Sequence, residues 1–374
     1  MSPSVEKFQT KFRTLTAMMG KGEGKVAPSV VLGDMLRKRM RALRLEAEIR
    51  HVFGPRRASI GLSDVTAVCS LRDGEQFIPH FLAHHRRLGV RHFVLLDNGS
   101  QDATLDLLRR QRDVTLFASD LPYGKYKHLF KRFLVRQTGR GRWSLLVDID
   151  ECFDFPGSDR MSIAGFCRYL DAHGYNAVVA HMLDLFHAGP LLDPPATNDG
   201  DLARAYPFYD ISNIKADDHI KAFGPTNTIA DAAIKCLSCG INKTVFGNDV
   251  LLTKHPLIRW APPIELPKFS HDIGYANIAD VSAVLYHFKF TADFARVIER
   301  ALEEKSYFNG SARYQRIAEQ LERNPRLSLR GRNARRLDSV NDLVEAGFLR
   351  SSPRFDRWMD DGFMMPRADY ACSA

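Results

Sequence analysis

The sequence has few cysteines and no long apolar run. Its six cysteines stand at positions 69, 152, 167, 236, 239 and 372. This is not the dense spacing of a disulfide framework, so we expect a reducing, cytoplasmic location. Nowhere do about 18 apolar residues follow one another, and the N-terminus lacks the apolar stretch and cleavage site of a secretory signal. These absences predict a chain that stays where it is made.

No compositional bias marks the chain as collagen-like, low-complexity or intrinsically disordered. Its 374 residues are 45% hydrophobic, 10% aromatic and 26% charged. Such values are typical of a soluble protein with one large domain plus additions, or with two domains. An enzyme is therefore among the classes that remain.

Positive charge is concentrated near the N-terminus. Residues 1–60 hold 13 Lys and Arg against five Asp and Glu, whereas residues 61–374 are almost neutral despite a net charge of +9 for the chain. A body that binds nucleic acid needs a basic face of its own, because it must neutralise phosphates. We therefore expect no nucleic-acid partner.

Residues 1–62 are predicted to form a basic, largely helical arm. Within residues 32–52, helical spacing relates a set of apolar side chains: Leu32, Met35, Leu36, Met40, Leu43 and Ala47. This stripe either packs on the main domain or lies on an anionic membrane surface. The second reading would place the protein at the periphery of the inner membrane surface.

From residue 64 onward, short β-branched runs alternate with helical patterns. Strands are predicted over residues 64–71, 92–96, 114–118 and 143–149, and helices over 75–88, after 102, and over 127–137. Such alternation is typical of a mostly parallel, Rossmann-like α/β sheet flanked by helices. We predict this domain over residues 63–290 and a helical C-terminal region over 291–374.

Acidic residues follow two of the predicted strands. Asp97 ends the second strand, and Asp148 and Asp150 end the fourth. In open sheets of this kind ligands bind beyond the carboxyl ends of the strands. Alternation along a strand would send Asp148 and Asp150 to the same side, where their mutual repulsion calls for a cation such as Mg²⁺ or Mn²⁺. The alternatives are a solvated strand end and, less favoured, a phosphotransferase with a nucleophilic aspartate.

With these residues in place, a family resemblance is visible. The matching segments are 72–77 (RDGEQF), 84–90 (HHRRLGV), 97–104 (DNGSQDAT) and 143–151 (WSLLVDIDE). Together they resemble the glycosyltransferase family 2-like group and the related family 92 enzymes, which have the GT-A fold. The resemblance implies that Asp97 contacts the nucleobase or ribose of a nucleotide-sugar. It further implies that Asp148 and Asp150 hold the metal and the diphosphate.

The loop after the first predicted strand departs from the family pattern. The family usually has Arg-Asn-Glu or Lys-Asn-Glu there, whereas this chain has Arg72-Asp73-Gly74. Arg72 still follows a strand end, where it could neutralise phosphate. A surface arginine is the alternative.

Three further residues complete the expected site. Asp184 follows a predicted strand over 177–183 and is the first candidate for the base that takes the acceptor proton, with a turn aspartate or the group Asp217, Asp218 and His219 as alternatives. The segment Tyr286-His287-Phe288-Lys289 resembles a late family motif, which implies His287 as a metal ligand and Lys289 as a diphosphate contact. A core histidine and a snorkelling lysine are the alternatives.

The expected activity is a metal-dependent glycosyl transfer, in the synthesis of a polysaccharide or other glycan. A nucleotide-sugar would donate the sugar to an acceptor hydroxyl with Mn²⁺ or Mg²⁺ as the cofactor, and the resemblance implies inversion at the anomeric carbon. A nucleotidyltransferase that makes nucleotide-sugars is an alternative, disfavoured because residues 70–77 contain only one glycine. A non-catalytic membrane-surface module is the other, and it predicts no nucleotide affinity.

Overall fold

The computed structural model describes residues 39–56, 61–197, 200–266, 271–304 and 312–361. The chain divides after Glu48 into two units. The described part of the first is a helix over residues 39–48, and residues 32–38 of the predicted amphipathic stretch lie outside the described range. Within the described residues, every helix is too short or too polar to cross a lipid bilayer.

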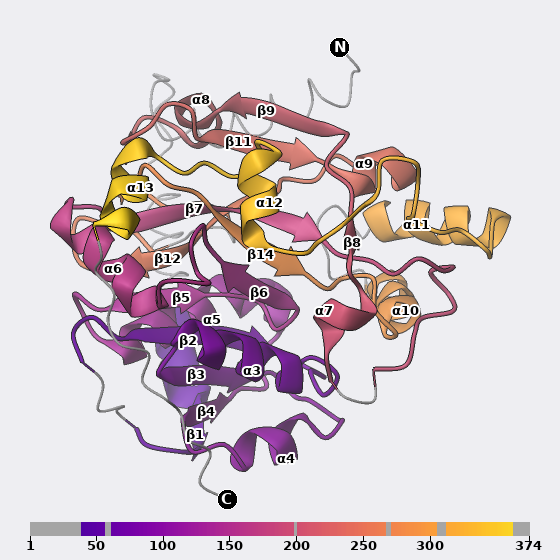
Figure 1. The fold of residues 1–374 in the computed structure, drawn as a ribbon. Coiled ribbons are helices and arrows are strands. Elements are labelled where there is room, and N and C mark those ends of the chain that lie inside the picture. Colours follow the sequence, from indigo (N-terminus) through magenta and orange to yellow (C-terminus); the bar gives the residue numbers. More distant parts are fainter. Residues whose placement is uncertain (1–38, 57–60, 198–199, 267–270, 305–311, 362–374) are drawn as a thin grey trace, which may run out of the picture. The chain divides into compact units, whose positions relative to one another are not determined.

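The second unit is built on an 11-stranded sheet (Figure 1). Its strands are β1 (Arg50–Phe53), β2 (Val65–Leu71), β3 (His92–Asp97), β4 (Val114–Ala118), β5 (Trp143–Leu146), β6 (Glu151–Asp154), β7 (Ala177–Asp184), β10 (Thr228–Ile229), β12 (Thr253–Arg259), β13 (Asn277–Ile278) and β14 (Ala283–His287). They run in the order β1-β4-β3-β2-β5-β12-β7-β13-β10, and β14 pairs with both β7 and β6. Most pairings are parallel, and β1, β12 and β6 supply the antiparallel ones.

Helices flank this sheet. They are α3 (Ile78–Leu88), α4 (Thr104–Arg109), α5 (Tyr123–Thr138), α6 (Ile163–Ala172), α7 (Leu202–Ala205), α8 (His219–Phe223), α9 (Ile241–Phe246), α10 (Phe294–Glu304), α11 (Ala312–Arg323), α12 (Val340–Glu345) and α13 (Pro353–Asp360). Figure 1 shows α3 on the near side of the sheet and α5 behind it. Two small sheets pair β9 (Ile214–Asp218) with β11 (Lys235–Cys239), and β8 (Phe208–Tyr209) with β15 (Arg335–Arg336). The prediction of a mostly parallel α/β sheet flanked by helices is confirmed.

The first three predicted strands are confirmed, and their sequences are mostly apolar. All residues of β2, β3 and β4 are buried. A parallel sheet covered on both faces needs such continuous apolar runs. Between β2 and β3, α3 ends at Gly89, whose φ of 100° is a left-handed conformation that glycine adopts at little cost.

The fourth predicted strand is shorter than expected. β5 ends at Leu146, and residues 147–150 form a turn that leads into β6. In this turn the amide of Glu151 donates to the carbonyl of Asp148 at 3.0 Å. The strand alternation invoked for Asp148 and Asp150 is therefore wrong, because neither residue lies in a strand.

The predicted domain boundaries also need correction. β1 lies inside the predicted arm 1–62 and overlaps the end of the stretch 32–52, yet it pairs with β4 at the edge of the main sheet. At the other end, residues of α12 and α13 belong to the main core rather than to a separate helical region: Val340, Leu343 and Phe355 pack there. The C-terminal part of the chain also contributes the strand β15.

A second, smaller core lies beside the sheet. It joins Phe186 and Leu191 of the loop after β7 to Phe246 at the end of α9 and to side chains of α10 and α11. The backbone of this loop also pairs with β8, through Phe186 and Phe208. This packing fixes the chain that follows Asp184.

Candidate functional site

Three side chains meet at one end of the sheet, two from the adjacent strands β14 and β7 and one from the turn before β6. His287 ends β14, opposite Asp184 of β7 and Glu151 of β6 in register. Its Nδ1 lies 2.5 Å from Oδ1 of Asp184, and its Nε2 lies 3.3 Å from Oδ2 of Asp150. The imidazole therefore bridges two carboxylates that come from different parts of the chain.

Burial and charge oppose each other at His287. Burial by itself lowers the pKa of the imidazole, but the carboxylates of Asp150 and Asp184 overcome this and raise the pKa to about 10. Burial likewise raises the pKa of Asp184, and the hydrogen bond and charge of His287 outweigh it, leaving that pKa below its usual value. The three groups form one electrostatic unit.

This unit continues to Asn242 and Lys289. The side-chain amide of Asn242, in α9, donates to Oδ2 of Asp184 at 2.6 Å. Nζ of Lys289 lies 3.4 Å from Oδ1 of Asn242. Burial lowers the pKa of Lys289 to about 8, against the opposing influence of Asp184. The structure thus brings together four predicted residues, Asp150, Asp184, His287 and Lys289.

Asp148 belongs to a neighbouring group with different partners. Lys131 of α5 donates to its Oδ1 at 2.9 Å, and Lys254 of β12 donates to its Oδ2 at 3.0 Å. Lys254 also pairs with the buried carboxylate of Glu151. Two ammonium groups therefore supply the positive charge that the sequence motif demands.

The charges of this second group stabilise one another. Burial raises the pKa of Asp148, but Lys131 and Lys254 hold it well below its usual range. Burial lowers the pKa of Lys254, and Asp148 and Glu151 reverse this and raise it above its usual value. At neutral pH Lys254 is therefore a fixed cation.

Asp97 is buried in a turn that its own carboxylate stabilises. Its carboxylate accepts from the amides of Gly99 and Ser100, at 3.1 and 3.2 Å, and from the Ser100 hydroxyl. This is the turn-forming geometry that aspartate commonly adopts. Its predicted contact with a nucleobase or ribose stays a prediction.

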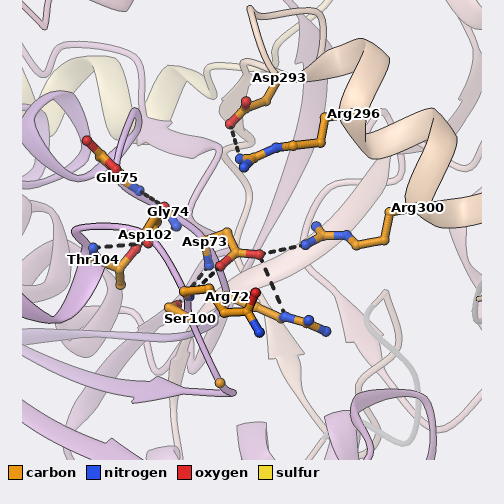
Figure 2. A network of polar contacts seen from close by, with 12 residues as sticks. Arg72, Asp73, Gly74, Glu75, Ser100, Asp102, Thr104, Asp293, Arg296 and Arg300 are labelled. Atoms are coloured by element: carbon orange, nitrogen blue, oxygen red, sulfur yellow. Dashed lines mark hydrogen bonds and ion pairs between the residues drawn. The ribbon is translucent and has the colours of Figure 1, made fainter.

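Arg72 lies in a polar network that ties the loop after β2 to α10 (Figure 2). Its Nε is 3.7 Å from Oδ2 of Asp73, and Arg300 of α10 donates to the same oxygen at 2.7 Å. The amide of Asp73 donates to the Ser100 hydroxyl at 2.8 Å, and Asp73 has a left-handed φ of 52°. The Arg72 side chain is 41% exposed. A phosphate contact for Arg72 stays a prediction.

The loop that carries Arg72 is also held by Asp102. Its carboxylate accepts from the amide of Glu75 at 3.0 Å, and Glu75 accepts in turn from the amide of Ala103. Figure 2 shows Asp102 between Glu75 and Thr104, and its carboxylate accepts from the amides of both. The amide of Gly74 donates to the Thr104 hydroxyl. The family-like segments after β2 and β3 therefore stabilise each other directly.

The structure separates the side chains of the alternative base residues, Asp217, Asp218 and His219. Asp217 is half-buried on β9, and Asp218 caps α8 by accepting from the amide of Lys221 at 2.9 Å. His219 is buried, with its Nε2 2.9 Å from Nε2 of His255. These residues do not share a site.

The donor set at Asp150 suits a divalent metal ion. A carboxylate oxygen and an imidazole nitrogen 3.3 Å apart are near the separation of two ligands of one ion. Behind His287, Asp184 occupies the position of a carboxylate that fixes the ring of a ligating histidine. Asp148 fits less well, because both its oxygens already accept from lysines.

Sequence reasoning missed Lys131, Lys254 and Asn242. Lys254 stands in the run Thr253–Arg259, which forms a central strand between β5 and β7 that was not predicted. A lysine within an otherwise apolar strand was the available signal, since such a residue is buried only with a partner. For Lys131 and Asn242, the sequence offers no comparable signal.

Comparisons with known proteins do not define a family. No family model matches the sequence, and no curated protein matches it. Among solved structures, one similar chain is a nucleotidyl transferase from Methanothermobacter thermautotroptrophicus, with 14% identity and a TM-score of 0.19. The match covers 34% of this chain and 63% of that chain. At this level the likeness identifies neither a fold family nor an activity.

Proposed function

We propose that the protein is a metal-dependent glycosyltransferase with a GT-A fold, which transfers a sugar from a nucleotide-sugar to a hydroxyl of a glycan or other acceptor. The observation that carries the proposal is the contact of His287 with Asp150 and Asp184 at the point where the parallel strands β7 and β14 end. Three of the four family-like segments support it, because the loops after β2 and β3 and the turn after β5 all lie at the same end of the sheet.

In this mechanism Asp150 and His287 hold Mn²⁺ or Mg²⁺. When bound, the ion offsets the negative charge that grows on the departing nucleoside diphosphate. Asp184 accepts from Nδ1–H of His287, so that Nε2, once it has given up its proton, would offer its lone pair to the ion. Lys289 supplies a second positive charge near Asp184 and is the proposed diphosphate contact.

The role of Asp184 is better supported as orienting than as a base. Its Oδ1 already accepts from His287 and its Oδ2 from Asn242, and the side chain is only 4% exposed. A base must reach the acceptor hydroxyl directly or through one water. We therefore propose Asp184 as the residue that positions His287.

Calorimetry with UDP, GDP and CDP, with and without Mn²⁺, tests the proposal. We expect one nucleoside diphosphate to bind only when the metal is present. A screen of nucleotide-sugars for metal-dependent release of that diphosphate then identifies the donor. Release of pyrophosphate from a nucleoside triphosphate and a sugar phosphate would instead identify a nucleotidyltransferase, and no nucleotide affinity would support a non-catalytic module.

We also propose that the basic arm contacts an anionic membrane surface. In the helix over residues 39–48, Met40 and Leu43 are 68% and 57% exposed, and Arg39, Arg41 and Arg44 are exposed with them. Apolar and basic side chains together favour an anionic lipid surface. Binding to vesicles with phosphatidylserine, but not to phosphatidylcholine vesicles, is the expected result, and equal absence of binding to both would remove the proposal.

A further inference from the structure

A second group of metal-ligating side chains lies on the other side of β6. One ring nitrogen each of His80 and His84, together with Sγ of Cys152, lie within 4.8 Å of one another. His80 and His84 are one turn apart on α3 and so point from the same face of that helix. Cys152 faces them from β6, while Glu151, the preceding residue, faces Lys254.

The hydrogen bonds of His84 define which nitrogen is available. Nε2 lies 2.7 Å from the carbonyl oxygen of Phe153, which can only accept, so Nε2 carries the proton. The lone pair is therefore on Nδ1, which accepts from Arg87 at 3.2 Å. A carbonyl contact on the opposite nitrogen is the usual support of a metal-bound histidine.

The surroundings favour the neutral, metal-binding form of both rings. Burial lowers the pKa of His80 and of His84 to about 4, and burial raises the pKa of the Cys152 thiol, which must give up its proton to bind an ion. Asp201 lies 3.8 Å from Nδ1 of His80 and adds negative charge on that side. Arg87 opposes binding and would have to leave Nδ1 of His84.

We propose that His80, His84 and Cys152 form a zinc-type transition-metal site, separate from the Asp150 and His287 pair. Two imidazoles and one thiolate suit Zn²⁺ or Co²⁺, whereas Mg²⁺ and Mn²⁺ prefer carboxylate and water oxygens. As the metal–sulfur bond forms, the Cys152 thiol releases its proton to solvent. A water molecule would complete a four-coordinate ion.

The experiment is a Co²⁺ titration of the full chain after chelation, in the presence of excess Mg²⁺ to occupy oxygen-rich sites. We expect about one equivalent to bind with a thiolate-to-cobalt charge-transfer band, and Zn²⁺ to displace it. Cys152→Ser should abolish the band. His80→Gln should weaken Co²⁺ binding by at least about tenfold, since even the loss of a supporting contact costs a metal site that much.

Cys167→Ser is the matched control, because Cys167 is a fully buried cysteine on α6 outside this group. It should keep the band. His80, whose side chain is 10% exposed, gives a variant expected to fold even if Cys152→Ser does not. In it the rise in melting temperature that Zn²⁺ causes in the parent should disappear. Absence of the band in the parent, or its survival in Cys152→Ser, would overturn the proposal.

Discussion

Two groups of carboxylates stand a few residues apart at the end of the sheet, and they are neutralised in different ways. Asp148 and Glu151 are paired with Lys254, and Asp148 also with Lys131. Asp150 instead faces the imidazole of His287. The sequence motif treats the acidic residues as equivalent, but the structure does not.

The two groups differ in whether their cation can lose a proton and bind a metal ion. An ammonium group has no lone pair at neutral pH, so Lys254 can only hold its carboxylates in place. An imidazole that loses a proton becomes a metal ligand, so His287 can exchange its proton for an ion. We infer that the lysine-paired group supports the structure, whereas the histidine-paired group is the one suited to chemistry.

Replacing Lys254 tests the structural side of this comparison. The Lys254 side chain is 7% exposed and that of Glu151 is 2% exposed, so Lys254→Met leaves a buried carboxylate without its cation. We expect a loss of about 3–5 kcal/mol in the free energy of unfolding, because breaking one side of a buried pair is strongly destabilising. Urea denaturation measures the loss.

The matched control for Lys254 is Lys215→Met. Lys215 pairs with Asp217 at 3.1 Å, but both side chains are more than 40% exposed. A surface pair of this kind contributes less than about 1 kcal/mol. If both variants lost the same small amount, Lys254 would have no special structural role.

Replacing Asp150 tests the chemical side. Asp150→Asn keeps the size of the side chain but removes the charge that faces His287. We expect metal-dependent release of nucleoside diphosphate to fall by about a hundredfold or more, because the developing charge loses much of its stabilisation. Stability should change little, since the Asp150 side chain is 28% exposed. Unchanged turnover, measured at saturating metal, would contradict the assigned site.

Removing the carboxylate behind His287 should have a smaller effect. Asp184→Asn removes the negative charge behind Nδ1 and leaves one acceptor oxygen for two donors, His287 and Asn242. Loss of a supporting contact of this kind typically changes metal affinity about 10–100-fold. Mn²⁺ affinity should fall and turnover should recover at high Mn²⁺, whereas loss of a base would lower turnover at every metal concentration. Asp217→Asn on β9, where the side chain is 42% exposed, is the control.

The fold was predictable where the sequence pattern was local. Continuous apolar runs fixed β2, β3 and β4, and the alternation with helices indicated the parallel sheet. β12 was missed because Lys254, His255 and Pro256 interrupt its apolar pattern. Lys254 and His255 are tolerated in this strand only because distant residues pair with them. A single sequence does not display distant partners.

The site was predictable in its parts but not in its connections. The sequence predicts Asp150 and His287 as metal ligands, Asp184 as a base and Lys289 as a diphosphate contact. The structure joins the first three through His287, and Asp184 to Lys289 through Asn242. By contrast, Asp148 was grouped with Asp150 by strand alternation, and the turn after Leu146 removed the basis for that grouping. Pairings across β6, β14 and β7 depend on register, which local spacing does not fix.

The smallest effect concerns buried histidines that lack a carboxylate partner in this region. Whereas the acids keep Lys254 charged, burial lowers the pKa of the neighbouring His181 to about 3, with His255 adding to the effect. The unfolded chain binds a proton near pH 6.5, so the contribution of His181 to stability is complete above that pH and declines as the pH falls toward 3. From pH 7 to pH 6 the loss is about 0.7 kcal/mol for one such histidine.

His181→Gln should therefore show a pH dependence of unfolding weaker by that amount, measured by urea denaturation at both pH values. An unchanged dependence would mean that burial does not lower the pKa of His181 in the folded protein.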